Sequence, residues 1–419
     1  MIKKNNFNKN RKQILLAPVG NKEMLITAID NGCNAVYLGI KGINMRERAK
    51  NFEINELKKI VDYAHSKNVE VYLTVNIICF NNEIKKIKKI LIEAKKIEID
   101  AIICWDLGVI KLCRELNLTI HLSTQASVSN IEAIKEYYKL GIKRFILARE
   151  CSLEDINEIK KKCKHIDKDI EIEIFVHGAM CVALSGRCFM SQFLYGDSTS
   201  ANRGKCIQPC RRKYIIKDPE TNKELEVHNN YILSPKDLCT IPFIEKILDS
   251  KVDVLKIEGR GRSPEYIKEV VSAYRKAIDL YNKNKLTDEI KEQLIKQVKK
   301  VYNRNFSSGF YLGKPINEWT NQYGSKATRQ KTYIGKIIKL FKKINVAEIK
   351  IHGHPIYLND NILIIGPKTG VIEQKVESLQ LDINNKITSA KQGEIIALKL
   401  NENNKFPKIG DKIYLIKNI

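Results

Sequence analysis

The chain has 419 residues, of which 43% are hydrophobic and 29% are charged, a composition that excludes a wholly disordered, collagen-like or membrane-spanning protein. Lys and Arg outnumber Asp and Glu by 73 to 48, which gives a formal net charge of +25. Such an excess favours contact with a polyanion such as RNA, although a general bias toward lysine would produce it as well.

The first 305 residues alternate short runs of Val, Ile and Leu with amphipathic segments of helical period, as successive β-α units do. Eight strands are predicted, at residues 14–18, 35–39, 69–76, 101–105, 119–123, 144–148, 171–176 and 252–258. Helices are predicted between several of them, at residues 54–66, 82–96, 130–140 and 153–163, and a long helix begins at about Pro264. This order predicts a (β/α)8 barrel over residues 13–305 after a basic tail at 1–12, with an open doubly wound sheet as the alternative.

The regular spacing breaks between the seventh and eighth strands. About 75 residues separate them, and a loop of that length is usually functional. This insertion, at about 178–250, leaves the C-terminal mouth of the barrel, where barrel enzymes keep their active sites. It holds five of the 11 cysteines, which are Cys181, Cys188, Cys206, Cys210 and Cys239.

The clustered cysteines predict a metal centre. Thiolates near Arg and Lys are soft ligands that suit zinc or an iron-sulfur cluster. The spacings CxxxxxxC and CxxxC lack the close CxxC pairs of zinc ribbons, so we favour a [4Fe-4S] cluster over zinc, with reactive or incidental thiols as the remaining alternative. The odd number of cysteines, the lack of a signal peptide and the lack of a long apolar stretch predict a cytoplasmic protein that does not contact membranes.

Polar and charged residues follow several predicted strands and are expected to line the mouth. Guanidinium groups bind carboxylates through two parallel hydrogen bonds, which makes the arginines candidates for binding a carboxylate. His177 is either a proton-transfer group or a buried core residue, and Glu258 either acts as a base or orients Arg260. The full candidate set at the mouth is Arg46, Arg48, Asn76, Ser123, Gln125, Arg149, Glu150, His177, Glu258, Arg260 and Arg262.

The end of the chain changes in character. Residues 306–331 read as a connector, and residues 332–419 contain short alternating runs separated by Gly, Asn and Pro, which predict a small all-β barrel or sandwich. This domain is expected either to grip a folded RNA or to serve as a structural or dimerisation unit. The sequence does not predict the oligomeric state.

Several motifs, in order along the chain, carry a family resemblance. They are LLAPVGN, NAVYLG, STQ, EIFVHGAMCVALSGRC, NRGKCIQPCRR, SPKDL and KIEGR. Over most of residues 14–300 the chain resembles the collagenase-like peptidase family of unknown catalytic type, the U32 peptidase family. The resemblance implies a barrel, a [4Fe-4S] cluster and oxygen-independent hydroxylation, with RNA hydroxylases among the members that use prephenate as hydroxyl donor.

The resemblance also assigns the metal ligands. Cys181, Cys188 and Cys206 match the first three cluster ligands, and the fourth is Cys239 or Cys210. We rank Cys239 first because it precedes the last barrel strand and could fold back over the mouth.

Taken with this resemblance, we expect a prephenate-dependent hydroxylase acting at C5 of the wobble uridine of tRNA, with His177, Glu258 and Arg260 as catalytic residues. A 23S rRNA base is the alternative substrate. A collagenase-like peptidase is the alternative from another class, although the chain contains neither an HExxH nor a GxSxG motif.

Overall fold

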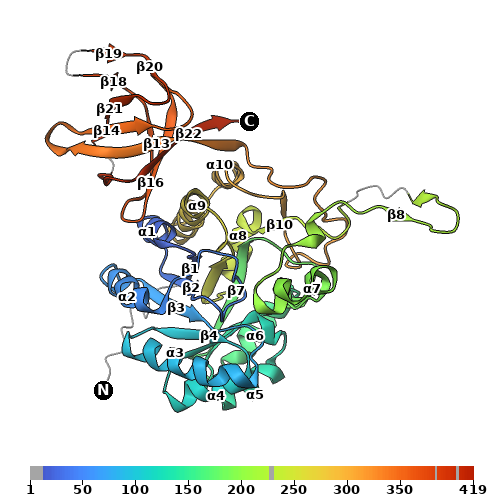
Figure 1. The fold of residues 1–419 in the computed structure, drawn as a ribbon. Helices are drawn as coiled ribbons and strands as arrows, with labels where there is room; N and C mark the ends of the chain where they lie inside the picture. The colour runs from blue at the N-terminus through green and yellow to red at the C-terminus, as the bar shows by residue number, and fades with distance from the viewer. Residues whose placement is uncertain (1–12, 226–230, 383–384, 403–404) are drawn as a thin grey trace.

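A closed barrel of eight parallel strands forms the body of the protein in the computed structural model, which describes residues 13–225, 231–382, 385–402 and 405–419 (Figure 1). In order round the barrel the strands are β1 (Ile14–Pro18), β2 (Ala35–Gly39), β3 (Glu70–Thr74), β4 (Ala101–Cys104), β5 (Ile120–Leu122), β6 (Arg144–Ile146), β7 (Glu171–Gly178) and β11 (Val254–Ile257). Strand β11 pairs with both β7 and β1, which closes the ring. The predicted barrel is confirmed, and the open sheet is excluded. The predicted basic tail at 1–12 lies outside the described residues.

Helices alternate with these strands and cover the outside of the barrel (Figure 1). They are α1 (Lys22–Asp30), α2 (Leu57–His65), α3 (Ile84–Lys96), α4 (Leu107–Glu115), α5 (Ile131–Lys139), α6 (Leu153–Cys163), α8 (Ile244–Asp249), α9 (Pro264–Asn282) and α10 (Asp288–Lys299). Side-chain caps fix several starts: the Asn21, Asp106, Asn130 and Ser152 side chains each accept a hydrogen bond from an amide in the first turn. Among the described helices, none combines the length and the apolar character needed to cross a membrane.

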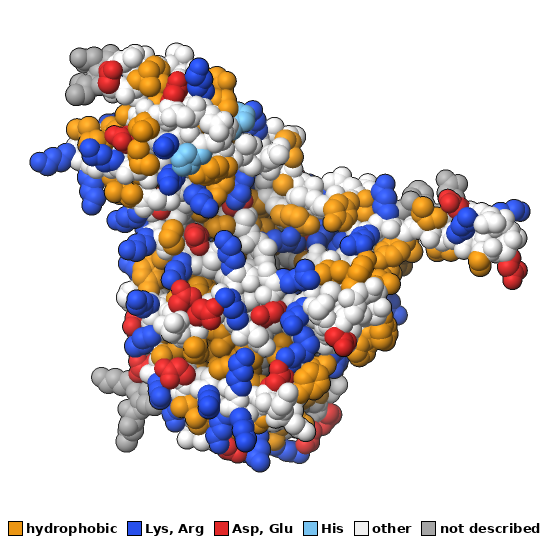
Figure 2. All heavy atoms as spheres, viewed as in Figure 1, with side chains coloured by type: hydrophobic (Ala, Val, Ile, Leu, Met, Phe, Trp, Pro, Cys, Tyr) orange, Lys and Arg blue, Asp and Glu red, His pale blue; other side chains and the backbone are white. Residues whose placement is uncertain are grey.

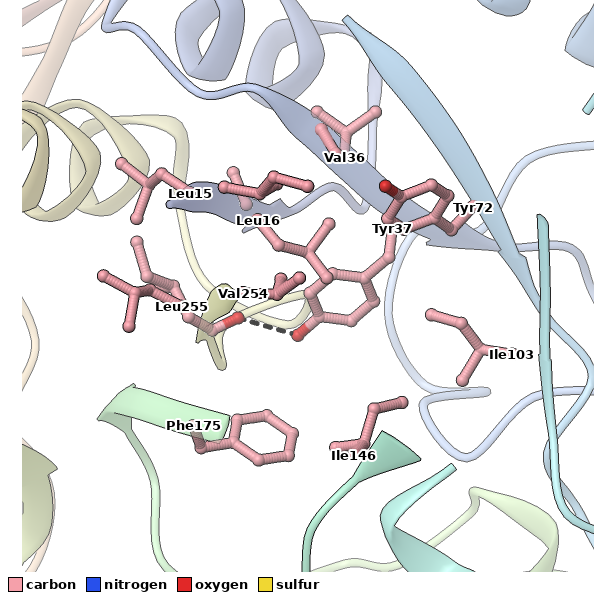
Figure 3. Packing of buried hydrophobic residues seen from close by; sticks show 14 of the residues in the cluster. Leu15, Leu16, Val36, Tyr37, Tyr72, Ile103, Ile146, Phe175, Val254 and Leu255 are labelled. Carbon is pink, nitrogen blue, oxygen red and sulfur yellow. Dashed lines mark hydrogen bonds between the residues drawn. The ribbon is translucent and has the colours of Figure 1, made fainter. Parts of the chain in front are cut away.

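The barrel interior is packed at one end and open at the other. Figure 3 shows Tyr37, Ile103, Ile146 and Phe175 converging from different strands toward the centre. At the N-terminal end, the buried Arg144 guanidinium donates to Glu171 at 2.8 Å and to the Tyr72 hydroxyl at 2.8 Å. A cavity lined by residues from several strands lies at the C-terminal end.

The insertion after β7 extends the barrel sheet. It contains α7 (Met190–Tyr195), a hairpin of β8 (Ile216–Lys217) and β9 (Glu224–Leu225), and β10 (Asp237–Cys239). Strand β10 runs antiparallel to the end of β7, and β12 (Phe306–Ser307) pairs with β10 in turn. The segment predicted as a connector, residues 306–331, thus begins as a strand of the barrel sheet.

The C-terminal domain is an antiparallel sheet with its own apolar core, as predicted. Its order is β17 (Gly370–Lys375), β16 (Asn361–Gly366), β22 (Lys412–Asn418), β13 (Arg329–Phe341), β14 (Val346–Ile351), β21 (Ile395–Lys399), β18 (Leu379–Gln380) and β19 (Lys386–Ile387), and β15 (Ile356–Tyr357) pairs separately with β20 (Ser389–Ala390). It sits over α1 and α9 (Figure 1). Glu373 of β17 forms ion pairs with Lys268 of α9 and with Arg329 of β13, and the pair with Lys268 connects the two domains.

Candidate active site at the barrel mouth

A cavity at the C-terminal mouth brings together residues from the ends of most barrel strands. Polar and charged residues in its lining include Arg46, Asn76, Ser123, Gln125, Arg149, Glu150, Cys181, Lys256, Glu258 and Arg260. All but Lys256 are residues that the sequence placed at the mouth or in the cysteine cluster. They meet because the carboxyl ends of parallel strands share one end of a barrel.

Glu258 forms an ion pair with Arg46. The Arg46 Nε donates to Oε1 of Glu258 at 3.0 Å, across 212 positions of sequence. Burial by itself would raise the pKa of Glu258, but Arg46, Arg149 and Arg260 outweigh it and lower the pKa to about 2. Glu258 is therefore a carboxylate at neutral pH and a weak proton acceptor. It pairs with Arg46, so the expectation that it orients Arg260 is not met.

Arg260 is held by neutral groups instead. Its Nη1 donates to Thr74 Oγ1 at 3.1 Å and its Nη2 to Asn44 Oδ1 at 2.6 Å, while only 3% of the residue is exposed. Gly39 leaves room for it, because a Cβ there would lie 2.2 Å from Nη1. Burial lowers the pKa of Arg260 to about 10, so the group is still charged at neutral pH. No carboxylate of the described residues lies within ion-pair distance of Arg260.

Arg149 is the second guanidinium in the mouth without a carboxylate partner in the described chain. Its Nη1 donates to the Ala179 carbonyl at 2.7 Å, and its guanidinium lies over the Phe175 ring at 3.9 Å. A guanidinium stacked in this way keeps donors free in the plane of the group. Arg149 and Arg260 thus place two guanidinium groups in the cavity, and neither forms a direct ion pair with a carboxylate of the described residues.

Amide and hydroxyl groups line the same cavity. Asn76 accepts a hydrogen bond from the Met45 amide at 3.2 Å, and its Nδ2 lies 3.4 Å from Gln125 Oε1. The Ser123 hydroxyl also donates to Gln125 Oε1. These buried groups form a connected network, which fixes their orientation at the mouth.

Lys256 is a residue that the sequence analysis missed. Its Nζ donates to the buried Glu173 at 2.7 Å and lies 4.4 Å from the centre of the Tyr37 ring. Burial lowers the pKa of Lys256, and Glu173 opposes that effect. The signal was present in KIEGR, because Lys256 lies two residues before Glu258, and alternate residues of an extended chain point to the same side.

A second cavity adjoins the first and contains four of the five clustered cysteines. Cys181, Cys188, Cys206 and Cys210 line it, and Cys181, Arg46 and Glu258 are shared with the mouth. Backbone amides already point at two of the sulfurs: Met190 N lies 3.4 Å from Cys188 Sγ, and Gln208 N lies 3.2 Å from Cys206 Sγ. In the part of the chain that the structure describes, no three Cys, His, Asp or Glu side chains converge closely enough to hold a metal ion. The four cysteines therefore line the cavity, but their sulfur atoms do not come together around one point.

Cys239 and His177 lie apart from both cavities. They form a register pair between β10 and β7, and Cys239 is 1% exposed with its sulfur 3.9 Å from the Tyr274 hydroxyl. The His177 ring packs against Tyr266, Tyr274 and Phe306. Burial, with a smaller effect of Arg262, lowers the pKa of His177 to about 3. The structure thus places both side chains in the core behind the mouth.

The two remaining arginines border the cysteine cavity. Arg48 is exposed and its Nε donates to the Lys205 carbonyl at 2.9 Å, while the Arg262 guanidinium lies 3.6 Å from the centre of the Tyr302 ring. Both line this cavity rather than the barrel mouth. The five predicted arginines are therefore divided between two adjoining sites.

Residues 20–321 match the sequence model of Peptidase family U32, and this range includes the barrel after β1, the insertion and more than half of the connector. The chain belongs to Peptidase family U32. Among the U32 relatives, a collagenase of Porphyromonas gingivalis is 40% identical over 96% of this chain and 97% of its own length. An uncharacterized protease of Methanocaldococcus jannaschii is 42% identical over 96% and 98%. The tRNA hydroxylation protein P1 of Bacillus subtilis is 32% identical over 94% and 93%.

Proposed function

We propose that this U32 protein hydroxylates C5 of the wobble uridine of tRNA without oxygen, with prephenate as the hydroxyl donor. The observation that carries the proposal is a mouth cavity with two guanidinium groups that lack a carboxylate partner in the described chain, beside a cavity lined by four cysteines. The name of the Bacillus subtilis relative supports tRNA as the substrate.

The unpaired guanidiniums fit a co-substrate with two carboxylates. Arg149 and Arg260 line one cavity, and both have hydrogen-bond donors beyond those used in the protein. Charge-assisted bonds to carboxylates are stronger than neutral ones, and they offset the cost of burying Arg260. The Arg46–Glu258 pair stays ionised beside them and fixes the edge of this binding site.

The cysteines suit a [4Fe-4S] cluster. Cys181, Cys188, Cys206 and Cys210 would hold it, and the amides that point at Cys188 and Cys206 would tune it, since hydrogen bonds to sulfur shift cluster potentials. We assign the fourth position to Cys210 rather than to the preferred Cys239, because Cys239 is buried behind the mouth. A bound cluster would supply one-electron redox chemistry, and an external electron acceptor would take up the two electrons and the proton that leave the base when a hydroxyl replaces the C5 hydrogen.

An anticodon loop suits this site as a substrate. Its wobble base is unpaired, so placing it in the mouth costs less than extruding a base from a duplex. The net charge of +25 supplies a general attraction to phosphates. Hydroxylation of a 23S rRNA base by the same residues is the alternative within this chemistry.

Proteolysis is the alternative supported by the relatives that are named collagenase. A nucleophilic peptidase needs a serine, threonine or cysteine next to a base. The described residues that line the two cavities include no histidine, so the nucleophile–histidine pair of such a peptidase is not assembled there.

Mass spectrometry of nucleosides tests the proposed function. We expect tRNA from cells that lack the protein to lose 5-hydroxyuridine derivatives, and re-expression to restore them, while the rRNA profile stays constant. A change confined to rRNA would select the alternative substrate. Unchanged tRNA and rRNA, together with gelatin cleavage by the purified protein, would replace hydroxylation with proteolysis.

A further inference from the structure

A short helix of the insertion presents aromatic side chains to solvent. Phe189, just before α7, is 58% exposed, and Phe193, Leu194 and Tyr195 within it are 84%, 54% and 42% exposed. The Phe189 and Phe193 rings stack on each other, with centroids 5.6 Å apart and planes 24° apart. We call these four residues the aromatic ledge. Exposed apolar clusters of this kind mark binding surfaces.

The surroundings of the ledge are strongly basic. The Arg212 guanidinium lies 5.3 Å from the centre of the Tyr195 ring and donates to its hydroxyl at 2.6 Å. Residues 182–217 contain seven Lys and Arg but a single acidic residue, Asp197, which accepts a hydrogen bond from Gln192. Figure 2 shows hydrophobic and basic side chains intermixed over the region of α7. An anionic partner with apolar faces matches this surface.

The ledge is fixed beside the catalytic cavities. Met190 and Ser191, the first residues of α7, line the cysteine cavity. The Thr199 hydroxyl donates to the Ser191 carbonyl at 2.7 Å, which holds the buried side of the helix in place. The aromatic side chains therefore stand on a rigid element at the edge of the site.

The same pairing of arginine with an aromatic ring recurs on the loops around the mouth. Arg187 lies 5.7 Å from the Trp105 ring centre, and Arg203 lies 5.3 Å from that of Phe80, which is itself 57% exposed. Trp105 and Phe80 follow β4 and β3, so these pairs stand on the rim of the barrel. The combination of exposed rings and guanidinium planes is typical of surfaces that bind single-stranded nucleic acid.

We propose that the aromatic ledge is the stacking platform for unpaired bases of an RNA loop, next to the base that enters the mouth. This inference rests on the proposed action on RNA and adds the surface that holds the loop. Bases stack on the Phe189 and Phe193 rings, while the arginines and lysines around them neutralise the adjoining phosphates. Protein partners offer no such combination of stacked apolar faces with one negative charge per nucleotide.

Binding measurements on the double variant Phe189→Ala/Phe193→Ala test the ledge without using catalysis. The probe is a fluorescent RNA hairpin with a loop of unpaired uridines, and an RNA duplex with the same number of phosphates serves as reference. We expect the double variant to bind the hairpin at least about tenfold more weakly, because each lost base–aromatic stack is worth about 1–3 kcal/mol. The slope of log K against log salt should not change, since no phosphate contact is removed.

Two control variants show whether a loss of affinity is specific to the ledge and to stacking. Tyr357→Ala removes a 49% exposed aromatic ring from the C-terminal domain and should leave hairpin affinity unchanged. Phe189→Trp/Phe193→Trp keeps the stacking faces and should retain wild-type affinity. Because the ledge residues are exposed, the variants should keep the melting temperature and iron content of the wild type.

Three results would overturn the inference. They are wild-type hairpin affinity in the double alanine variant, equal affinity of the wild type for hairpin and duplex, and a fall in oligomer mass by sedimentation with no change in RNA binding. The last result would make the ledge an interface between two copies of the chain. Weaker hairpin binding by the double alanine variant would support the ledge even if nucleoside analysis showed no hydroxylation. The two proposals can therefore fail separately.

Discussion

At the scale of single residues, the mouth depends on how its charges are paired. Glu258 neutralises Arg46 and Glu173 neutralises Lys256, while Arg149 and Arg260 have no carboxylate partner in the described chain. A buried guanidinium without a counter-ion is costly to keep charged, which is why the pKa of Arg260 falls to about 10. An anionic co-substrate removes that cost, so this pattern of charges favours its binding.

The variant Arg260→Ala tests this role. We expect kcat/KM for prephenate to fall by about tenfold to a hundredfold, because a charge-assisted hydrogen bond is worth about 1.5–3 kcal/mol. Iron content and RNA affinity should stay close to wild type. Arg114→Ala, at an exposed position at the end of α4, is the matched control and should change none of these quantities. Full activity in Arg260→Ala would exclude the role, and loss of iron would make Arg260 a support for the cysteine cavity.

The fourth cluster ligand is tested by two alanine variants measured under the same anaerobic conditions. Cys210→Ala should lose the iron and the brown colour, because Cys210 lines the cavity with Cys181, Cys188 and Cys206. Cys239→Ala should keep both and lose only about 1 kcal/mol of stability from the deletion of one buried atom. The opposite pattern of iron content would return the assignment to Cys239.

At the scale of elements, the position of the insertion determines where the cysteine cavity lies relative to the barrel mouth. Gly204 has a φ of +73°, and a Cβ there would lie 2.2 Å from the Asn44 carbonyl oxygen. Arg203 beside it donates to the Ile78 carbonyl and pairs with Glu83. These contacts hold the insertion against the loops that follow β2 and β3. As a result, the cysteine cavity lies next to Arg46.

Replacing this glycine should separate the two cavities. We expect Gly204→Ala to displace the insertion and to lower iron content and hydroxylation together, while far-ultraviolet circular dichroism shows an intact barrel. Gly196→Ala is the control, because Gly196 also has a positive φ but nothing lies within 4 Å of its Cβ position. Its backbone has φ of 80° and ψ of 177°, a region that is almost restricted to glycine, so the alanine should cost about 1–3 kcal/mol of backbone strain and keep the iron. Equal iron loss in both variants would show that strain, not the collision at Asn44, is responsible.

The strands also show which parts of the fold could be predicted from the sequence and which could not. The first two strands lie at the predicted residues. Both faces of a parallel barrel strand are buried, so such a strand is a continuous apolar run that can be found in the sequence. Strand β10 was not predicted: it has three residues and includes the buried Asp237, which pairs with the distant Arg304 at 3.2 Å. The burial of Cys239 follows from that pairing. The Arg46–Glu258 pair likewise joins residues that no local pattern connects.

At the scale of the whole molecule, a charged contact ties the C-terminal domain to the barrel. Burial would raise the pKa of Glu373, but Lys268 and Arg329 outweigh it and lower the pKa. A carboxyl whose folded pKa is lowered stabilises the fold above its unfolded pKa, and this stability is lost as pH falls through the folded value. The contact between the domains is therefore expected to weaken in acid.

Urea unfolding as a function of pH tests this contact. We expect Glu373→Gln to lower the free energy of unfolding by about 1 kcal/mol at neutral pH, a value typical of a partly buried ion pair, and by less as the pH falls below the ordinary range for Glu. Glu377→Gln, at an exposed position after β17, should match the wild type throughout. A deficit of Glu373→Gln that persists unchanged in acid would show that charge is not what holds the two domains together.

The most direct test of the account is the mass of tRNA after anaerobic incubation with the purified protein, prephenate and a one-electron acceptor dye. The acceptor is included because hydroxylation removes two electrons from the base. We predict that one uridine, at the wobble position, gains a single oxygen atom with the wild type and prephenate together, and much less with Arg260→Ala. An unchanged tRNA mass under all conditions, or an equal gain without prephenate, would contradict the account.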